Sequence, residues 1–165
     1  MKEVYPNLYV GNDADYQRVA GAADWCFVQA AKEPWHRQAL GYRTHGAPKT
    51  HPEYLWARRG NRLILNLIDA PDAAYIPASV LWTAVEHIRV WLSEGRRVLV
   101  HCNQGTSRGP GIVFLYIATY TDRLPDSSFA EAEAVFKLLY GRYQPGEGMR
   151  AALAREFTRL QRIQQ

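Results

Sequence analysis

One short run of residues holds the groups that could do covalent chemistry on a phosphate. Residues 101–108 read His-Cys-Asn-Gln-Gly-Thr-Ser-Arg and directly follow the apolar run 98–100. The apolar run predicts a short buried strand, so Cys102 is expected at the carboxyl end of a strand, where open α/β sheets bind their ligands. A cysteine at that place, with Arg108 six positions later, could form a nucleophilic site for an anion.

The segment after this run predicts a helix that starts beside the cysteine. Apolar residues recur between 112 and 117, and Pro110 suits a first helical turn, where its missing N–H would have no intrahelical partner. The loop therefore ends at a helix N-terminus, whose free N–H groups and positive dipole end favour an anion. Gly105 supplies the unusual backbone dihedrals that such a loop needs. We expect a phosphate to be bound by Asn103, Gln104, Gly105, Thr106, Ser107 and Arg108.

The side chains of this run have separate expected tasks. A free thiol is only about 3% ionised at pH 7, so Cys102 needs the loop amides, the helix end and Arg108 to favour its thiolate. Arg108 can also hold two phosphate oxygens with its planar fork and follow their charge into the transition state. His101 is expected to brace the loop with its ring turned into the fold, because an ionised nucleophile needs no base. No metal or other cofactor is expected, since the five histidines show no His-x3-His spacing.

These residues resemble the Cys-x5-Arg signature of the cysteine-dependent protein tyrosine phosphatases. The likeness is greatest to the dual-specificity branch, in which His precedes the Cys and Ser-Arg closes the loop, and residues 5–12 and 63–69 are similar to the first strand and the general-acid strand of that branch. The resemblance implies a phosphomonoester hydrolase with a cysteinyl-phosphate intermediate. It further implies a dual-specificity-type protein phosphatase that acts on phosphotyrosine, phosphoserine or phosphothreonine.

The resemblance also implies an aspartate general acid about thirty residues before the cysteine, and Asp69 lies at that interval. Cys102 would attack phosphorus while Asp69 protonates the leaving oxygen, and Asp69 would then direct water onto the phosphocysteine. Asp72 lies in the same Asp-Ala-Pro-Asp turn and competes for the role. We favour Asp69, although spacing alone does not exclude Asp72.

One position departs from the family pattern. The residue after the arginine is usually Ser or Thr, whose hydroxyl steadies the departing thiolate, and here it is Gly109. Hydrolysis of the phosphoenzyme could therefore be slow unless Thr106 or Ser107 replaces that hydroxyl. The alternatives are a slow or inactive phosphate-binding module and a phosphatase that acts on a phosphoinositide or an RNA 5′ end. A rhodanese-like sulfurtransferase is disfavoured by the arginine and by the aspartate loop.

The composition is typical of one globular domain, and we expect that domain to span residues 1–165. Hydrophobic residues make up 47% and charged residues 22% of the chain. Two cysteines argue against a disulfide framework, and Cys26 is expected to be inert packing in the apolar run 25–28, with a resolving thiol as the alternative. The sequence shows no pattern typical of a signal peptide or of a membrane span, so we expect a cytoplasmic location. The net charge of +4 suits a phosphorylated protein or another phosphomonoester, whereas scattered basic pairs disfavour nucleic acid as a partner.

Alternating strand and helix patterns predict an α/β fold. We expect a three-layer sandwich whose mostly parallel central sheet of four to five strands is flanked by helices, as in the protein tyrosine phosphatases. Strands are predicted near residues 8–10, 24–29, 63–66 and 97–101, and helices over residues 14–20, 77–94, 110–120, 127–141 and 147–163. Residues 33–62 hold too many aromatic side chains for disorder, and they are predicted to form an ordered insertion near the mouth of the pocket that shapes substrate choice.

Overall fold

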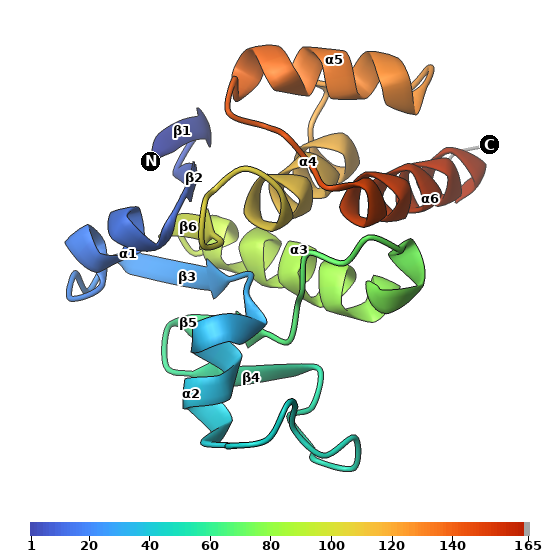
Figure 1. Ribbon diagram of the computed structural model, residues 1–165. Coiled ribbons are helices and arrows are strands. Elements are labelled where there is room, and N and C mark those ends of the chain that lie inside the picture. The colour runs from blue at the N-terminus through green and yellow to red at the C-terminus, as the bar shows by residue number, and fades with distance from the viewer. Residues whose placement is uncertain (164–165) are drawn as a thin grey trace.

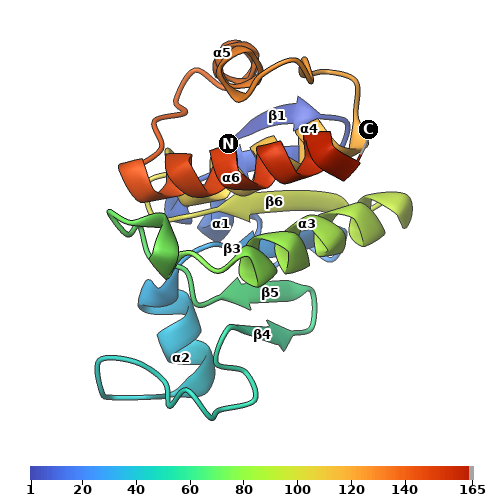
Figure 2. The same cartoon turned by 90° about the vertical axis from the view of Figure 1, so that its right-hand side faces the viewer.

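The computed structural model describes residues 1–163 and shows one six-stranded sheet, in the order β1-β2-β6-β3-β5-β4. The strands are β1 (Lys2–Tyr5), β2 (Leu8–Gly11), β3 (Trp25–Gln29), β4 (Trp56–Arg59), β5 (Arg62–Leu65) and β6 (Arg97–His101). The four central strands run parallel, and β1 and β4 pair antiparallel at the two edges. Figure 2 shows these edge strands at opposite ends of the sheet. The carboxyl ends of the parallel strands therefore meet along one side, where β6 delivers Cys102.

Helices cover both faces of the sheet, which makes the fold a three-layer α/β sandwich (Figure 1). They are α1 (Asp13–Val19), α2 (Arg37–Leu40), α3 (Ala78–Ser93), α4 (Arg108–Tyr120), α5 (Phe129–Leu139) and α6 (Glu147–Ile163), with short turns η1 (Lys32–His36) and η2 (Ala73–Tyr75). One face packs against α3 and α4, and α5 and α6 pack on α4. The other face packs against α1 and η1. The central strands are thus buried on both sides.

The side chains of the central strands alternate between the two faces, as the period of a β-strand requires. Val98 and Val100 of β6 join the large core under the helices, whereas Leu99 joins the smaller core beneath α1. Cys26 of β3 lies in the large core as a free thiol that is 3% exposed, and burial raises its pKa. This agrees with the expected packing role of Cys26.

The sheet has six strands rather than the four to five expected. Both additional strands are sheet edges that lack an apolar run. In β1, Lys2 and Glu3 are exposed, so the segment has no clear hydrophobic signal. β4 lies inside residues 33–62 and returns into β5 through Gly60, whose φ is +59°. The segment predicted to be an insertion is ordered, but its last part belongs to the central sheet.

The predicted helices are all present, with ends that differ by a few residues. The helix 147–163 has the expected bounds, and the helix expected at 110–120 begins at Arg108. Pro110 therefore takes the third helical position, where no donor is yet required. Within residues 1–163, no helix is long and apolar enough to cross a membrane.

The packing of the core predicts that the stability of the fold depends strongly on Phe114 of α4. Its fully buried ring packs edge to face against Phe129 and Phe136, with ring centroids 5.5 Å apart in both pairs. Phe114→Ala should lower the free energy of unfolding by about 3–5 kcal/mol in urea titrations. Leu138 is 83% exposed and serves as the control. Leu138→Ala should change the free energy of unfolding by less than about 0.5 kcal/mol. Equal losses in the two variants would contradict this description of the core.

Candidate active site

The cysteine lies in a loop between the end of β6 and the start of α4. Cys102 follows His101 directly and is 2% exposed. Gly105 forms the turn of the loop with φ of +71°, and a Cβ there would lie 2.7 Å from the carbonyl oxygen of Gly11. Only glycine fits both the backbone conformation and the close approach to β2.

The outward-facing groups of the loop are hydrogen-bonded to several separate parts of the chain. Asn103 Nδ2 donates to Asp13 Oδ2 (3.0 Å), the Tyr140 hydroxyl to the Gly105 carbonyl (2.8 Å), Arg142 to the Gln104 carbonyl (3.0 Å), and the Gln144 N–H to the Thr106 carbonyl (2.8 Å). By contrast, no N–H of residues 103–108 has an acceptor within the described part of the chain. Free N–H groups in a loop that leads into a helix are the groups that bind anions.

Arg108 is held with part of its guanidinium free. Nη1 donates to the carbonyl oxygen of Leu67 (3.0 Å), and Nη2 donates to Asn103 Oδ1 (2.7 Å). The Nε atom is buried and has no acceptor among residues 1–163. A buried guanidinium N–H without a partner is costly, so an anionic oxygen that reached this atom would stabilise the site.

His101 braces the base of the loop, and its ring is turned into the fold as expected. The ring is fully buried and stacks on Tyr16 with centroids 4.8 Å apart, while Nδ1 lies 3.1 Å from Asp13 Oδ1. Burial lowers the pKa of His101, although Asp13 opposes this, so the ring is neutral and donates from Nδ1.

Asp13 accepts the hydrogen bonds that anchor this side of the loop. Burial alone would raise the pKa of Asp13, but hydrogen bonds from His101, Asn103 and Trp35 outweigh it and lower the pKa to about 2. The carboxylate is therefore ionised over the whole neutral range. Asp13 escaped the sequence analysis, although its position just after a predicted strand was a usable signal.

Asp69 lies against the loop, whereas Asp72 does not. Ser107 Oγ donates to Asp69 Oδ1 (2.9 Å) and accepts from the N–H of Gly146 (3.0 Å). Asp72 instead caps η2 by accepting from the N–H of Ala74 (2.8 Å). Of the two carboxylates, Asp69 is the one that is bonded to the phosphate loop. The Ser107 hydroxyl is bonded to Asp69 and to Gly146, so it is not directed at the sulfur.

Gly109 packs directly on the backbone of the cysteine. A Cβ at this position would lie 3.2 Å from the carbonyl carbon of His101 and 3.3 Å from the backbone nitrogen of Cys102. These contacts are tight, but a shift of a few tenths of an ångström would relieve them.

Within residues 1–163, no group of three or more His, Cys, Asp and Glu side chains is arranged to hold a metal ion.

The loop predicts different outcomes for two glycine substitutions. Gly105→Ala should lower the free energy of unfolding by about 1–3 kcal/mol, because alanine is strained at positive φ and its Cβ would meet the Gly11 carbonyl. It should also abolish the stabilisation that added vanadate, a phosphate analogue, gives to the wild type in thermal unfolding. Gly141→Ala is the control, since a Cβ there meets nothing within 4 Å. Equal behaviour of the two variants would count against the described loop.

Comparisons with known proteins show what the chain is similar to in sequence and in fold. No family model matches the chain. Human dual specificity protein phosphatase 12 is 32% identical over 142 residues, which are 83% of this chain but only 36% of that protein's length. The crystal structure of human DUSP28 has a TM-score of 0.62 at 18% identity, over 96% of this chain and 93% of that chain. A leucine rich repeat and phosphatase domain containing protein from Entamoeba histolytica has a TM-score of 0.70 at 14% identity, over 99% and 94%. The chain is therefore similar in sequence to part of a human dual specificity protein phosphatase, and it shares its fold with solved structures of dual-specificity phosphatases.

Proposed function

We propose that this chain hydrolyses phosphomonoesters through a phosphocysteine at Cys102. The observation that carries the proposal is the loop 103–108, whose N–H groups have no acceptor within the described residues, next to a buried thiol and a buried, unpartnered Arg108 Nε. Such a loop can neutralise the oxygens of a phosphate with backbone dipoles and one guanidinium. The human relative named as a dual specificity phosphatase supports the same chemistry.

In the first step, the Cys102 thiolate attacks phosphorus in line with the ester oxygen. A sulfur–phosphorus bond forms while the bond from phosphorus to the leaving oxygen breaks, and Asp69 gives its proton to that oxygen. The Ser107 hydroxyl orients Asp69 through Oδ1. Oδ2 has no hydrogen bond within residues 1–163, so it is the oxygen available to carry the proton.

In the second step, water displaces the sulfur. Asp69, now a carboxylate, takes a proton from the water while the oxygen of that water bonds to phosphorus. The sulfur–phosphorus bond breaks, and Cys102 leaves as a thiolate. Gly109 offers no hydroxyl to that thiolate, which favours slow hydrolysis of the phosphoenzyme. A slow enzyme or a phosphate-binding module is therefore the second candidate function.

We propose a phosphorylated protein in the cytoplasm as the substrate, because the net charge of the chain is +4 and the segment 33–62 begins beside the loop. Of the six Arg and Lys residues in this segment, Arg58, Arg59 and Arg62 lie around the β4–β5 turn, at the amino end of β5 and away from Cys102, whereas the other three precede β4. Asn103 Nδ2 donates to the carbonyl oxygen of Glu33 (2.9 Å), so this segment begins at the loop. A cavity of about 200 Å³ between it and the residues around Asp69 is lined by Lys32, Ile68 and Tyr75, among others. Charge and position suit a protein chain with acidic side chains near its phosphate.

Turnover of an aryl phosphate in the presence of a metal chelator tests the two principal roles. Cys102→Ser should reduce phosphate release to background, because serine is not ionised at neutral pH. Asp69→Asn should lower kcat by a factor on the order of 10²–10⁴, whereas the matched control Asp72→Asn should stay near the wild-type rate. Turnover that survives Cys102→Ser would overturn the proposal, and loss in Asp72→Asn rather than Asp69→Asn would exchange the two aspartates.

The absence of a hydroxyl at position 109 predicts burst kinetics. Rapid mixing with p-nitrophenyl phosphate should release one equivalent of nitrophenol per site quickly, followed by a slower steady rate. Gly109→Ser should raise the steady rate about tenfold, since a hydrogen bond to a charged group contributes about 1.5–3 kcal/mol. Gly109→Ala is the control for the space that a Cβ takes, and it should not raise the rate. The idea fails if no burst occurs or if the two variants behave alike.

A further inference from the structure

The first turn of α6 is packed against both the loop that bears Asp69 and the phosphate loop. A Cβ on Gly148 would lie 2.1 Å from the carbonyl oxygen of Ala70 and 2.9 Å from the backbone nitrogen of Asp72. Gly146 donates its N–H to Ser107 Oγ, the same atom that bonds to Asp69. The start of the helix therefore contacts both the Asp69 loop and Ser107 of the phosphate loop.

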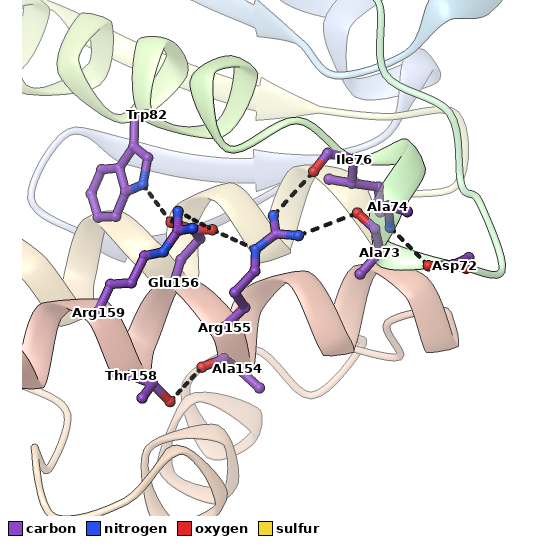
Figure 3. A network of polar contacts seen from close by, with 10 residues as sticks. All are labelled: Asp72, Ala73, Ala74, Ile76, Trp82, Ala154, Arg155, Glu156, Thr158 and Arg159. Carbon is purple, nitrogen blue, oxygen red and sulfur yellow. Dashed lines mark hydrogen bonds and ion pairs between the residues drawn. The ribbon is translucent and has the colours of Figure 1, made fainter.

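Arg155 lies two turns further along α6, and it is bonded to the segment that follows the Asp69 loop. Figure 3 shows its guanidinium reaching Ile76 and Ala73 at the two ends of η2. Nη2 donates to the carbonyl oxygen of Ile76 (3.1 Å), and Nη1 to that of Ala73 (3.4 Å). The Asp69 loop is thus fastened at its start by Ser107 and at its end by Arg155.

A fully buried carboxylate fixes the orientation of Arg155. Glu156 is 0% exposed and accepts from Arg155 Nε (2.7 Å), from Trp82 Nε1 of α3 (3.0 Å) and from Arg159 Nη1 (Figure 3). Burial alone would raise the pKa of Glu156, but the Trp82 and Arg155 hydrogen bonds outweigh it and lower the pKa, so the group is ionised. With Nε held by Glu156, Nη1 and Nη2 of Arg155 point toward the carbonyls of η2. A lysine could not make this set of bonds, because it lacks the planar fork.

We propose that Arg155 is a positioning residue, which holds the loop of Asp69 against the phosphate loop in the geometry that proton donation requires. The inference rests on the proposed function and adds a residue of α6, far along the chain from the signature. A small displacement of a catalytic group can cost about 10²-fold in rate. The loss should fall on substrates whose leaving group needs protonation, and it should largely spare those whose leaving group departs unaided.

The experiment compares phenyl phosphate, which has a poor leaving group, with p-nitrophenyl phosphate, which has a better one. Arg155→Met should lower kcat/KM at least about tenfold more for phenyl phosphate than for p-nitrophenyl phosphate. Arg159→Met is the matched control, because Arg159 shares Glu156 but does not bond to η2 in the structure. It should leave the ratio of the two rates unchanged.

A double variant distinguishes a positioning role of Arg155 from a general contribution to folding. In the double variant Arg155→Met/Asp69→Asn, the loss of rate on phenyl phosphate relative to p-nitrophenyl phosphate should be no greater than in Asp69→Asn alone, since both residues act through one proton. An equal loss on both substrates, or a fully additive double variant, would overturn the inference. Arg155→Lys, which keeps the charge, should show the same selective loss if Arg155→Met does not fold. Failure of the proposed function is a different result, namely turnover that survives Cys102→Ser.

Discussion

The site depends on an unequal distribution of hydrogen bonds along the loop after β6. The carbonyls and side chains that face outward are bonded to α1, to the segment after α5 and to the residues around Leu67, whereas the N–H groups of residues 103–108 have no acceptor within the described chain. Donors without acceptors are costly in a fold unless water or a ligand satisfies them. The rest of the molecule holds those donors in place, and an anion is the ligand that satisfies them best.

The strand, loop and helix that carry the proposed chemistry could be predicted from the sequence because the signature is local. A buried strand, a cysteine, a glycine, an arginine and a helix start all fall within about twenty consecutive residues. The period of the strand and the tolerance of Pro110 are properties of neighbouring residues, so they can be recognised without the fold. The preference for Asp69 over Asp72 rested on the interval from Asp69 to Cys102 and stays a prediction, which the hydrogen bond from Ser107 to Asp69 supports.

Other parts of the fold could not be predicted because they depend on distant pairs. β1 and β4 are short sheet edges with polar side chains, which resemble loops until a partner strand is known. Asp13 meets His101, and Tyr140 meets Gly105, only after the sheet is formed. The bond from Arg155 to Ile76 likewise joins residues far apart in sequence, and an arginine on a helix carries no signal of such a contact.

The central claim is that Cys102 accepts the phosphoryl group. Its most direct test is an acid quench of the wild-type protein during turnover of an aryl phosphate, followed by mass measurement of its peptides. One added phosphoryl group should be found on the peptide that contains Cys102, and it should be absent from Cys102→Ser. Turnover with no phosphoryl group on that peptide, or with the group on Cys26 instead, would contradict the account.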